Sequence, residues 1–508
     1  MKSQEINVPR QVERLLWLVL PVLAALPLLC SSLPPLTDLP AHIGRFAVQL
    51  GYGTDPGLKQ WYSFAWALVP NLGVDILVQV LGPVFGLERS VHWIVTTIPV
   101  LHVLGTLLLS KVVHGRITST AVLATPLAYG LVLNFGFVNY ALSIGLALIG
   151  AAVWIWLGRK GRPVLRAILF VPAGSVLWVC HLAGWAVFCV IAGCDAFTAA
   201  RARGHPLLPA AARAALTMMP LAAGPLAGIM ASPSGDGGAI VFSSLTSKVY
   251  WLKTVIWDAW PWWDLASAGV LVTLTAWVWS SHRFSLDRGL ALAGAALVLL
   301  YVVLPFGMGG SFYADMRLAP VMLTLLLVAA RPVEDTSERL VILMMAGALT
   351  FAGARFVGNA LSYRQWDAKF AQTLTLLDHV APNSQLVTLF VVGCEPDDPP
   401  NSERRAHFGG YAMERRQAFD NVQFIQAGAQ LLSVHNRAAG EFENMSGNGT
   451  TLNPCGDRPV LREVVQRIPP AMDSLWVIGV KPDMRLPGWS RTAYAGDAVL
   501  YRRGQSDR

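Results

Sequence analysis

Charged side chains are scarce in this sequence. Asp, Glu, Lys and Arg make up 14% of the 508 residues, whereas 54% of the residues are hydrophobic. Soluble globular proteins carry about a quarter charged residues, so this composition excludes an ordinary soluble protein. Apolar stretches long enough to cross about 30 Å of hydrocarbon recur between Leu15 and Val357. The sequence therefore predicts an α-helical polytopic membrane protein.

Cysteine is scarce too. Six Cys residues in a chain of this length are too few for a disulfide scaffold. Two of them, Cys394 and Cys455, lie in the polar C-terminal part, where an oxidising compartment would allow them to pair. Such a disulfide would close a long loop and stabilise the fold by about 4 kcal/mol; two free thiols are the alternative. The remaining Cys residues lie in apolar segments and are interpreted as small hydrophobic residues: Cys30, Cys180, Cys189 and Cys194.

Lys and Arg are not gathered into one basic patch, although the formal net charge is +8. They lie at the ends of apolar segments, where they mark membrane topology rather than a nucleic-acid surface. No nucleic-acid partner is expected.

The first apolar segment follows Arg10 and Arg14, and no clean small-residue cleavage site comes after it. We interpret it as a retained first span rather than a signal peptide. The expected spans number about eleven, at 15–33, 91–110, 118–134, 139–157, 165–180, 182–199, 207–230, 263–280, 287–305, 318–330 and 339–357.

The positive-inside rule fixes the expected orientation of these spans. An N-terminus on the inside requires 34–90 to be one long outside loop, with 71–85 lying on the membrane. The C-terminal part is then also outside. This threading places on the inside Lys111, Arg116, Arg159, Lys160, Arg162, Arg166, Arg201, Arg203, Arg283, Arg288, Arg331 and Arg339.

The composition changes near residue 359 to a mixture rich in charged and amide side chains. We expect residues 1–358 to form the transmembrane domain and 359–508 a small soluble α/β domain. Its expected elements are strands at 385–392 and 474–479 and helices at 366–380 and 460–468.

The outside loop opens with Pro34-Pro-Leu-Thr-Asp-Leu-Pro-Ala-His42 and continues with helical spacing. We expect an interfacial helix with its apolar face in the membrane. The polar stripe of this helix consists of Asp38, His42, Arg45 and Gln49, and its apolar stripe of Leu39, Ile43, Phe46 and Leu50.

A carboxylate beside a His and an Arg suits a reaction that deprotonates a hydroxyl while an anionic group leaves. Asp38 would accept the proton as general base, and His42 and Arg45 would stabilise phosphate charge. The alternative is that Asp38 only caps the helix. Asp38 and His42 could instead hold a divalent metal such as Mg or Mn, although two ligands four residues apart are a weak metal pattern.

Further polar residues fall at the outside ends of the expected spans. Convergence on one face favours a site there, because polar groups at membrane depth are costly. His181 could instead be a hydrogen-bonded bundle histidine, and Lys248 or Arg317 could meet lipid headgroups. The residues are the segment Asn134-Phe-Gly-Phe-Val-Asn139-Tyr140, His181, Lys248, Lys253, and Asp315 and Arg317 in Tyr313-Ala-Asp-Met-Arg317. Of these, we expect His181, Lys248, Asp315 and Arg317 to bind the substrate or its phosphate. Asp75 is interpreted as structural.

With a long first outside loop, an early acidic residue in Thr37-Asp-Leu-Pro-Ala-His42 and an outside C-terminal domain, the chain resembles the C-type (GT-C) membrane glycosyltransferases. The junction Phe85-Gly-Leu-Glu-Arg89 adds to the resemblance, which extends to relatives of protein mannosyltransferases and aminoarabinose transferases. Asp38 matches the family's catalytic acidic residue. The chain departs from the family in having no second acidic pair in this loop.

The resemblance implies transfer of a sugar from a polyprenyl-phosphate donor to a glycan, lipid or protein acceptor, with inversion. It also implies a bacterial inner membrane setting, with a cytoplasmic N-terminus, a periplasmic C-terminal domain and contact with membrane lipid. A lipid or oligosaccharide transporter or flippase is one alternative, but no internal repeat supports it. A non-catalytic membrane scaffold is another.

Overall fold

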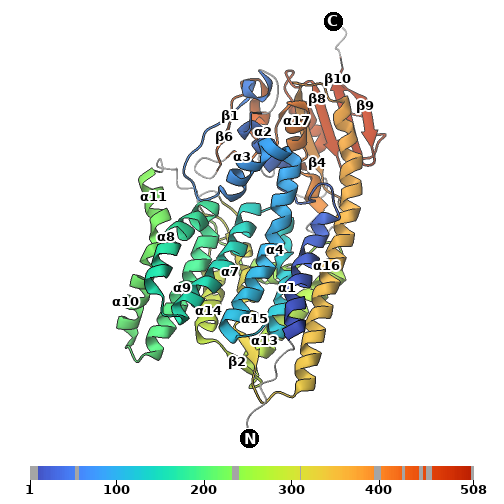
Figure 1. The fold of residues 1–508 in the computed structure, drawn as a ribbon. Helices are drawn as coiled ribbons and strands as arrows, with labels where there is room; N and C mark the ends of the chain where they lie inside the picture. The colour runs from blue at the N-terminus through green and yellow to red at the C-terminus, as the bar shows by residue number, and fades with distance from the viewer. Residues whose placement is uncertain are drawn as a thin grey trace.

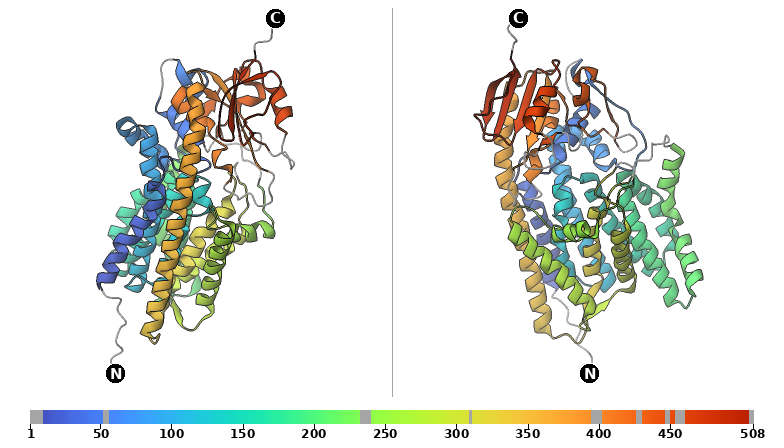
Figure 2. Two further views of the ribbon diagram at one scale, coloured as in Figure 1. Left: turned by 90° about the vertical axis from the view of Figure 1, so that its right-hand side faces the viewer. Right: turned by 180° about the vertical axis from the view of Figure 1, so that it is seen from behind.

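The computed structural model places a helical bundle beneath a small sheet-containing region, with the start of α1 and the C-terminal strands at opposite ends of the molecule (Figures 1 and 2). The described residues are 10–51, 56–231, 240–308, 311–393, 402–425, 430–445, 450–452 and 460–504.

Seven helical stretches in the described part of the chain are long and apolar enough to cross a membrane. They contain α1 (Arg10–Leu29), α4 (Leu87–His114), α7 (Val138–Arg159), α8 (Pro163–Cys180), α9 (Leu182–Ala202), α10 (Leu207–Met218) with α11 (Ala223–Ala231), and α16 (Glu338–Leu374). The chain is a multi-pass membrane protein, as predicted.

The four other expected spans correspond to helices outside this set of seven. They are α5 (Ser119–Ala124) with α6 (Leu131–Asn134), α13 (Pro261–Ser280), α14 (Arg288–Val303) and α15 (Ala314–Val328). The break between α5 and α6 has a local cause, because Pro126 lies in a short 3-10 turn (Thr125–Ala128) and Gly130 lies against the Val255 carbonyl oxygen. The total of eleven spans stays a prediction.

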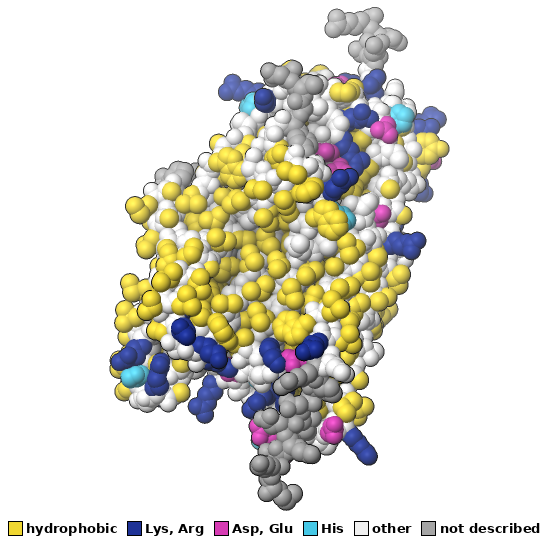
Figure 3. Space-filling model, in the orientation of Figure 1, with side chains coloured by type: hydrophobic (Ala, Val, Ile, Leu, Met, Phe, Trp, Pro, Cys, Tyr) yellow, Lys and Arg dark blue, Asp and Glu magenta, His cyan; other side chains and the backbone are white. Residues whose placement is uncertain are grey.

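A broad belt of hydrophobic side chains covers the middle of the face of the bundle seen in Figure 3. In α8, Val164, Ile168 and Val176 are all well exposed, as side chains facing lipid would be. Lys and Arg collect along the lower edge of the belt, at the end opposite the C-terminal sheet. This segregation is the pattern on which the predicted inside–outside assignment depends.

The long first loop lies at the same end of the molecule as the C-terminal region (Figure 1). It contains α2 (Leu39–Gln49), the strand β1 (Tyr62–Phe64) and α3 (Gly73–Phe85), and β1 pairs antiparallel with β6 (Leu432–Val434). The prediction that the apolar stripe of α2 lies in the membrane is wrong for most of that stripe. Leu39, Ile43 and Phe46 are fully buried inside the protein, because α17 (Gly409–Arg416) and α4 pack against this helix.

The C-terminal region is the expected α/β unit. Parallel strands β4 (Gln385–Val391) and β8 (Ser474–Ile478) form its centre, and the antiparallel strands β10 (Ala498–Arg503) and β9 (Trp489–Ala495) extend the sheet. The other edge of β4 pairs with β5 (Phe419–Asp420) and β7 (Thr451–Leu452), and α18 spans Leu461–Arg467. Helix α16 continues through the predicted domain boundary at Gly358 and ends near this sheet.

Three further short elements, one helix and two strands, connect helices of the bundle. Helix α12 (Leu245–Lys253) precedes α13, and β2 (Phe284–Leu286) pairs with β3 (Ala330–Pro332).

Candidate active site

Asp38 occupies the N-cap position of α2, but its carboxylate forms no capping hydrogen bond. The backbone holds the residue instead. The Asp38 amide donates to the Phe135 carbonyl over 2.9 Å, and the neighbouring Thr37 amide donates to the Asn134 carbonyl over 2.9 Å. The carboxylate is therefore not committed to the helix, contrary to the capping alternative.

Gly136 allows this close approach between the α6–α7 turn and the start of α2. Its φ of +91° lies in the region that favours glycine, and a Cβ here would come within 2.9 Å of the Asp38 nitrogen. The polar segment from Asn134 to Tyr140 thus holds Asp38 in place through its backbone.

A histidine from a distant part of the chain lies beside the Asp38 carboxylate. His407, just before α17, has its Nε2 atom 3.5 Å from Asp38 Oδ1. The Phe424 ring lies between the two imidazoles, with ring centroids 5.0 Å from His407 and 5.5 Å from His42. The C-terminal region therefore contributes side chains to the same site as the first loop.

Burial controls the protonation of these groups. It raises the pKa of Asp38 to about 7, opposed by the positive charge of Arg317 and reinforced by the negative charge of Glu403. Burial lowers the pKa of His407 to about 4, so its imidazole is neutral at pH 7 and its contact with Asp38 is not an ion pair. The pKa of His42 is also lowered by burial, and further by Arg45 and His407. A carboxylate with a pKa near neutrality is suited to act as a base.

Arg317, in the first turn of α15, lies close enough to Asp38 for its charge to affect that carboxylate. Its guanidinium lies 4.0 Å above the Phe137 ring, and its Nη1 is 3.4 Å from Ser311 Oγ. It forms no ion pair of 4 Å or less with a carboxylate among the described residues, and its Nε is buried without a hydrogen-bond partner there. Arg317 is consequently a cation that remains available for an anionic ligand.

Tyr140 and His181 are connected to Arg317. The Tyr140 hydroxyl donates to the Arg317 carbonyl oxygen, and the Tyr140 ring meets His181 edge to face at 5.5 Å. His181 also caps α9, where its Nδ1 accepts from the Ala183 amide over 3.1 Å. This is the hydrogen-bonded arrangement given above as the alternative for His181.

Two of the predicted phosphate-binding cations are already neutralised within the protein. Buried Arg45 forms an ion pair with buried Asp75, which also accepts from Asn139 over 3.2 Å. This cluster joins α2 to α3 and α7, so Asp75 has a structural environment.

Lys248 is held in the same way by other groups. Its Nζ lies 3.0 Å from Asp315 Oδ2 and donates to the carbonyl oxygens of Tyr301 and Leu304. The charge of Lys248 is therefore neutralised by Asp315 within the protein.

The residues predicted as metal ligands do not fit a metal site. The Nδ1 atom of His42 lies 3.3 Å from Arg45 Nη2, a group that can only donate, so this ring nitrogen accepts from Arg45. Within the described ranges, no three His, Cys, Asp or Glu side chains gather as a metal site would require. The predicted Cys394–Cys455 pair lies outside the described residues.

The sequence interpretation missed His407 and Glu403. Both come from the run Glu403-Arg-Arg-Ala-His407, which was treated only as part of a separate soluble domain. The concentration of titratable residues in this short run was the available signal.

Comparison with known proteins finds solved structures of similar fold but no similar sequence. No protein-family model and no curated protein sequence matches the chain. The crystal structure of ArnT from Cupriavidus metallidurans bound to undecaprenyl phosphate is similar over 98% of this chain and 99% of that one, with a TM-score of 0.50 and 12% identity. The cryo-EM structure of the arabinofuranosyltransferase AftD from Mycobacteria matches 97% of this chain and 40% of its own, with a TM-score of 0.45 and 16% identity. The chain has the fold of ArnT, which confirms the fold expected from its resemblance to the C-type membrane glycosyltransferases.

Proposed function

We propose that this protein is a membrane glycosyltransferase that moves a sugar from a polyprenyl-phosphate donor to an acceptor hydroxyl. The observation that carries the proposal is the proximity of Asp38, a carboxylate with a pKa near 7, to Arg317, a cation that forms no ion pair of 4 Å or less among the described residues. The fold shared with ArnT, whose crystal structure contains undecaprenyl phosphate, supports the choice of a polyprenyl-phosphate donor.

The proposed reaction is a single displacement. The acceptor hydroxyl oxygen forms a bond to the anomeric carbon of the sugar while the bond from that carbon to the phosphate oxygen breaks. Asp38 takes the hydroxyl proton, and the electron pair of the broken bond leaves on polyprenyl phosphate. Attack opposite the leaving group inverts the anomeric configuration.

Arg317 would stabilise the charge that develops on the leaving phosphate, and the aromatic residues around it would exclude water. The Arg317 guanidinium lies over Phe137, while Tyr313 is packed against Phe135 and Phe306 with ring centroids 5.5 and 4.8 Å away. His407 would act as a positioning residue for Asp38. No step of this scheme uses His42, Arg45, Lys248 or a metal ion.

A transfer assay with Asp38→Asn tests the proposed function. Purified protein in lipid nanodiscs would receive a panel of polyprenyl-phosphate sugars and a membrane extract containing acceptors, and release of polyprenyl phosphate would be measured. Wild-type protein should release it from at least one donor. Asn has nearly the same shape but cannot accept the proton, so the rate should fall by roughly 10²–10⁴-fold.

The matched control is Asp335→Asn, which makes the same change at an exposed position between β3 and α16. Undiminished release by Asp38→Asn would remove the proposed base. No release by wild-type protein from any donor would favour the scaffold or transporter alternatives.

A further inference from the structure

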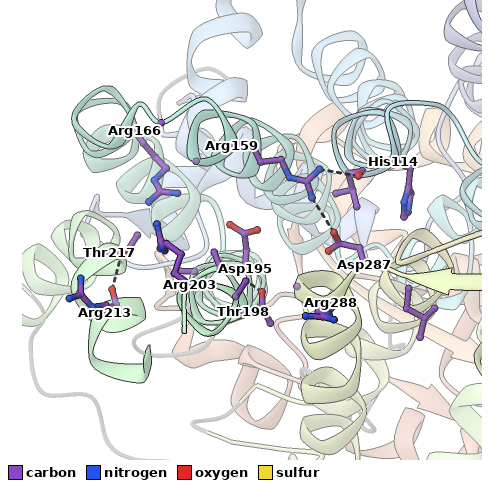
Figure 4. A pocket seen from close by; sticks show the side chains of 18 of the residues that line it. His114, Arg159, Arg166, Asp195, Thr198, Arg203, Arg213, Thr217, Asp287 and Arg288 are labelled. Carbon is purple, nitrogen blue, oxygen red and sulfur yellow. Dashed lines mark hydrogen bonds and ion pairs between the residues drawn. The ribbon is translucent and has the colours of Figure 1, made fainter. Parts of the chain in front are cut away.

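A large cavity opens at the end of the bundle opposite Asp38, where the basic side chains collect (Figure 4). Its volume is about 870 Å³. The ends of α7, α8, α9, α10 and α14 surround it, so its walls come from helices that reach into the hydrophobic belt. We call it the basic cavity.

Six arginines line the basic cavity, against two aspartates, which leaves four positive charges uncompensated. The aspartates are Asp195 and Asp287. The arginines are Arg159, Arg166, Arg203, Arg213, Arg288 and Arg331.

Some of these arginines already have roles within the protein. Arg159 pairs with Asp287 at 3.0 Å and donates to two backbone carbonyl oxygens at the end of α4. Arg166 lies 4.4 Å above the Trp154 ring. Both are therefore held in place on the cavity wall.

Three of the other arginines have no carboxylate partner in the part of the chain that the structure describes. Arg203, Arg213 and Arg288 form no ion pair with any residue that the structure describes. Arg203 directly follows α9, Arg213 lies in α10, and Arg288 is the first residue of α14. Figure 4 shows them around the cavity, with Arg213 beside Thr217. Guanidinium groups from separate helices that meet around a hollow are suited to an anion with several oxygens, and phosphate is the common case.

The surroundings of the cavity indicate a lipid rather than a soluble phosphate. Helices α8 and α10 both line it, and both carry exposed aliphatic side chains near the same end, including Val164, Ile168, Leu208 and Leu216. A phosphate in the cavity would thus have apolar surface beside it for acyl chains. Basic pockets between membrane helices on the cytoplasmic side commonly bind anionic headgroups in this way.

We propose that the basic cavity binds the phosphate headgroup of an anionic phospholipid from the leaflet opposite the Asp38 site. Arg203, Arg213 and Arg288 contact the phosphate, while Arg159 and Arg166 shape the wall. Asp195, half-buried in the same cavity, repels the anion and limits the affinity. The site is separate from the proposed transfer chemistry.

Native mass spectrometry of the full chain tests this proposal. Wild-type protein and the triple variant R203Q/R213Q/R288Q would be titrated with phosphatidylglycerol and with phosphatidylcholine. We expect wild-type protein to bind phosphatidylglycerol more tightly than phosphatidylcholine. The triple variant should lose this preference, since each basic residue near an anionic lipid contributes about fivefold in affinity. Asp195→Asn should shift affinity the other way and bind phosphatidylglycerol several-fold more tightly.

The matched control is K160Q/R162Q/R339Q, which removes three exposed charges that do not line the cavity. It should keep the preference. Equal loss in the control and the triple variant would show a general charge effect and overturn the site, as would weaker binding by Asp195→Asn. Competition with free inorganic phosphate separates the two sources of the anion: displacement of the lipid at low millimolar phosphate would overturn the lipid assignment.

Discussion

Asp38 and Arg317 illustrate how burial gives two ordinary side chains unusual properties. The carboxylate is only 16% exposed, and that burial raises its pKa, while Arg317 opposes the rise without forming a close ion pair. An exposed Asp would be fully ionised at pH 7 and a weaker base. The site thus depends on the covering supplied by the C-terminal region.

The pH dependence of transfer follows from the pKa of Asp38. The base must be deprotonated, and its pKa is raised to about 7, so activity should increase with pH and level off above 7. Below pH 7 the rate should fall about tenfold per unit. The measurement is the single-turnover rate from pH 5 to 9; a rate that stays constant down to pH 5 would contradict Asp38 as the base.

Replacement of Arg317 by Gln should change both the rate of transfer and its pH dependence. Loss of the unpaired cation should reduce kcat/KM for the donor roughly 10–100-fold, as expected for a charged hydrogen bond to phosphate. Because Arg317 favours the ionised form of Asp38, its removal should also shift the rise in the pH profile to higher pH. A reduced rate with an unmoved pH profile would contradict the proposed proximity of the two groups.

Lys248→Gln is the informative comparison for Arg317→Gln. It leaves Asp315 buried without its partner, so we expect a loss of stability of about 3–5 kcal/mol. Thermal unfolding should detect this loss in Lys248→Gln but not in Arg317→Gln. The opposite result would mean that Arg317, and not Lys248, is structural.

At the residue scale, the sequence was informative about candidates but not about their partners. Helical spacing correctly placed Asp38, His42 and Arg45 on α2. It could not show that Asp75, 30 residues away, pairs with Arg45, or that His407 lies beside Asp38. Such pairings depend on long-range packing, which periodicity does not report.

At the scale of elements, the contact between α2 and α17 brings the two halves of the site together. Glycines allow the close approach, since a Cβ on Gly410 would lie 1.8 Å from the Pro40 carbonyl oxygen and one on Gly44 would lie 2.9 Å from Met413 Sδ. Most of the apolar stripe of α2 is buried by this packing. Its periodicity predicted an apolar partner but could not distinguish a helix from the membrane.

Gly410→Ala should therefore separate α17 from α2. The new methyl group meets backbone, which cannot rotate away, so we expect a loss of about 1–3 kcal/mol in stability together with reduced transfer. Thermal unfolding and the transfer assay give the two readouts. Gly353→Ala in α16 is the control, because a Cβ there meets nothing within 4 Å; equal effects in both variants would contradict the packing argument.

Strongly patterned elements were predictable, and interrupted ones were not. The strands β4 and β8 and the helix α18 lie close to their expected positions, and long apolar runs gave the main helices. The segment 118–134 was expected as one span but is divided at Pro126 and Gly130. Hydrophobicity averaged over a window does not detect this break.

At the scale of the whole molecule, the two ends of the bundle are chemically different. One end carries the Asp38 site and the C-terminal sheet, and the other carries the basic cavity. The positive-inside rule predicts that the basic end faces the cytoplasm. A reporter fused after Gly161 should then read inside and one fused at the C-terminus outside; an outside signal at Gly161 would contradict the orientation.

The most direct measurement of the central claim is a structure of the protein with undecaprenyl phosphate bound. We predict that the phosphate contacts the Arg317 guanidinium, with open space between it and the Asp38 carboxylate for a sugar and an acceptor hydroxyl. A phosphate held away from both residues, or only in the basic cavity at the opposite end, would contradict the proposal that Asp38 and Arg317 form a glycosyl-transfer site.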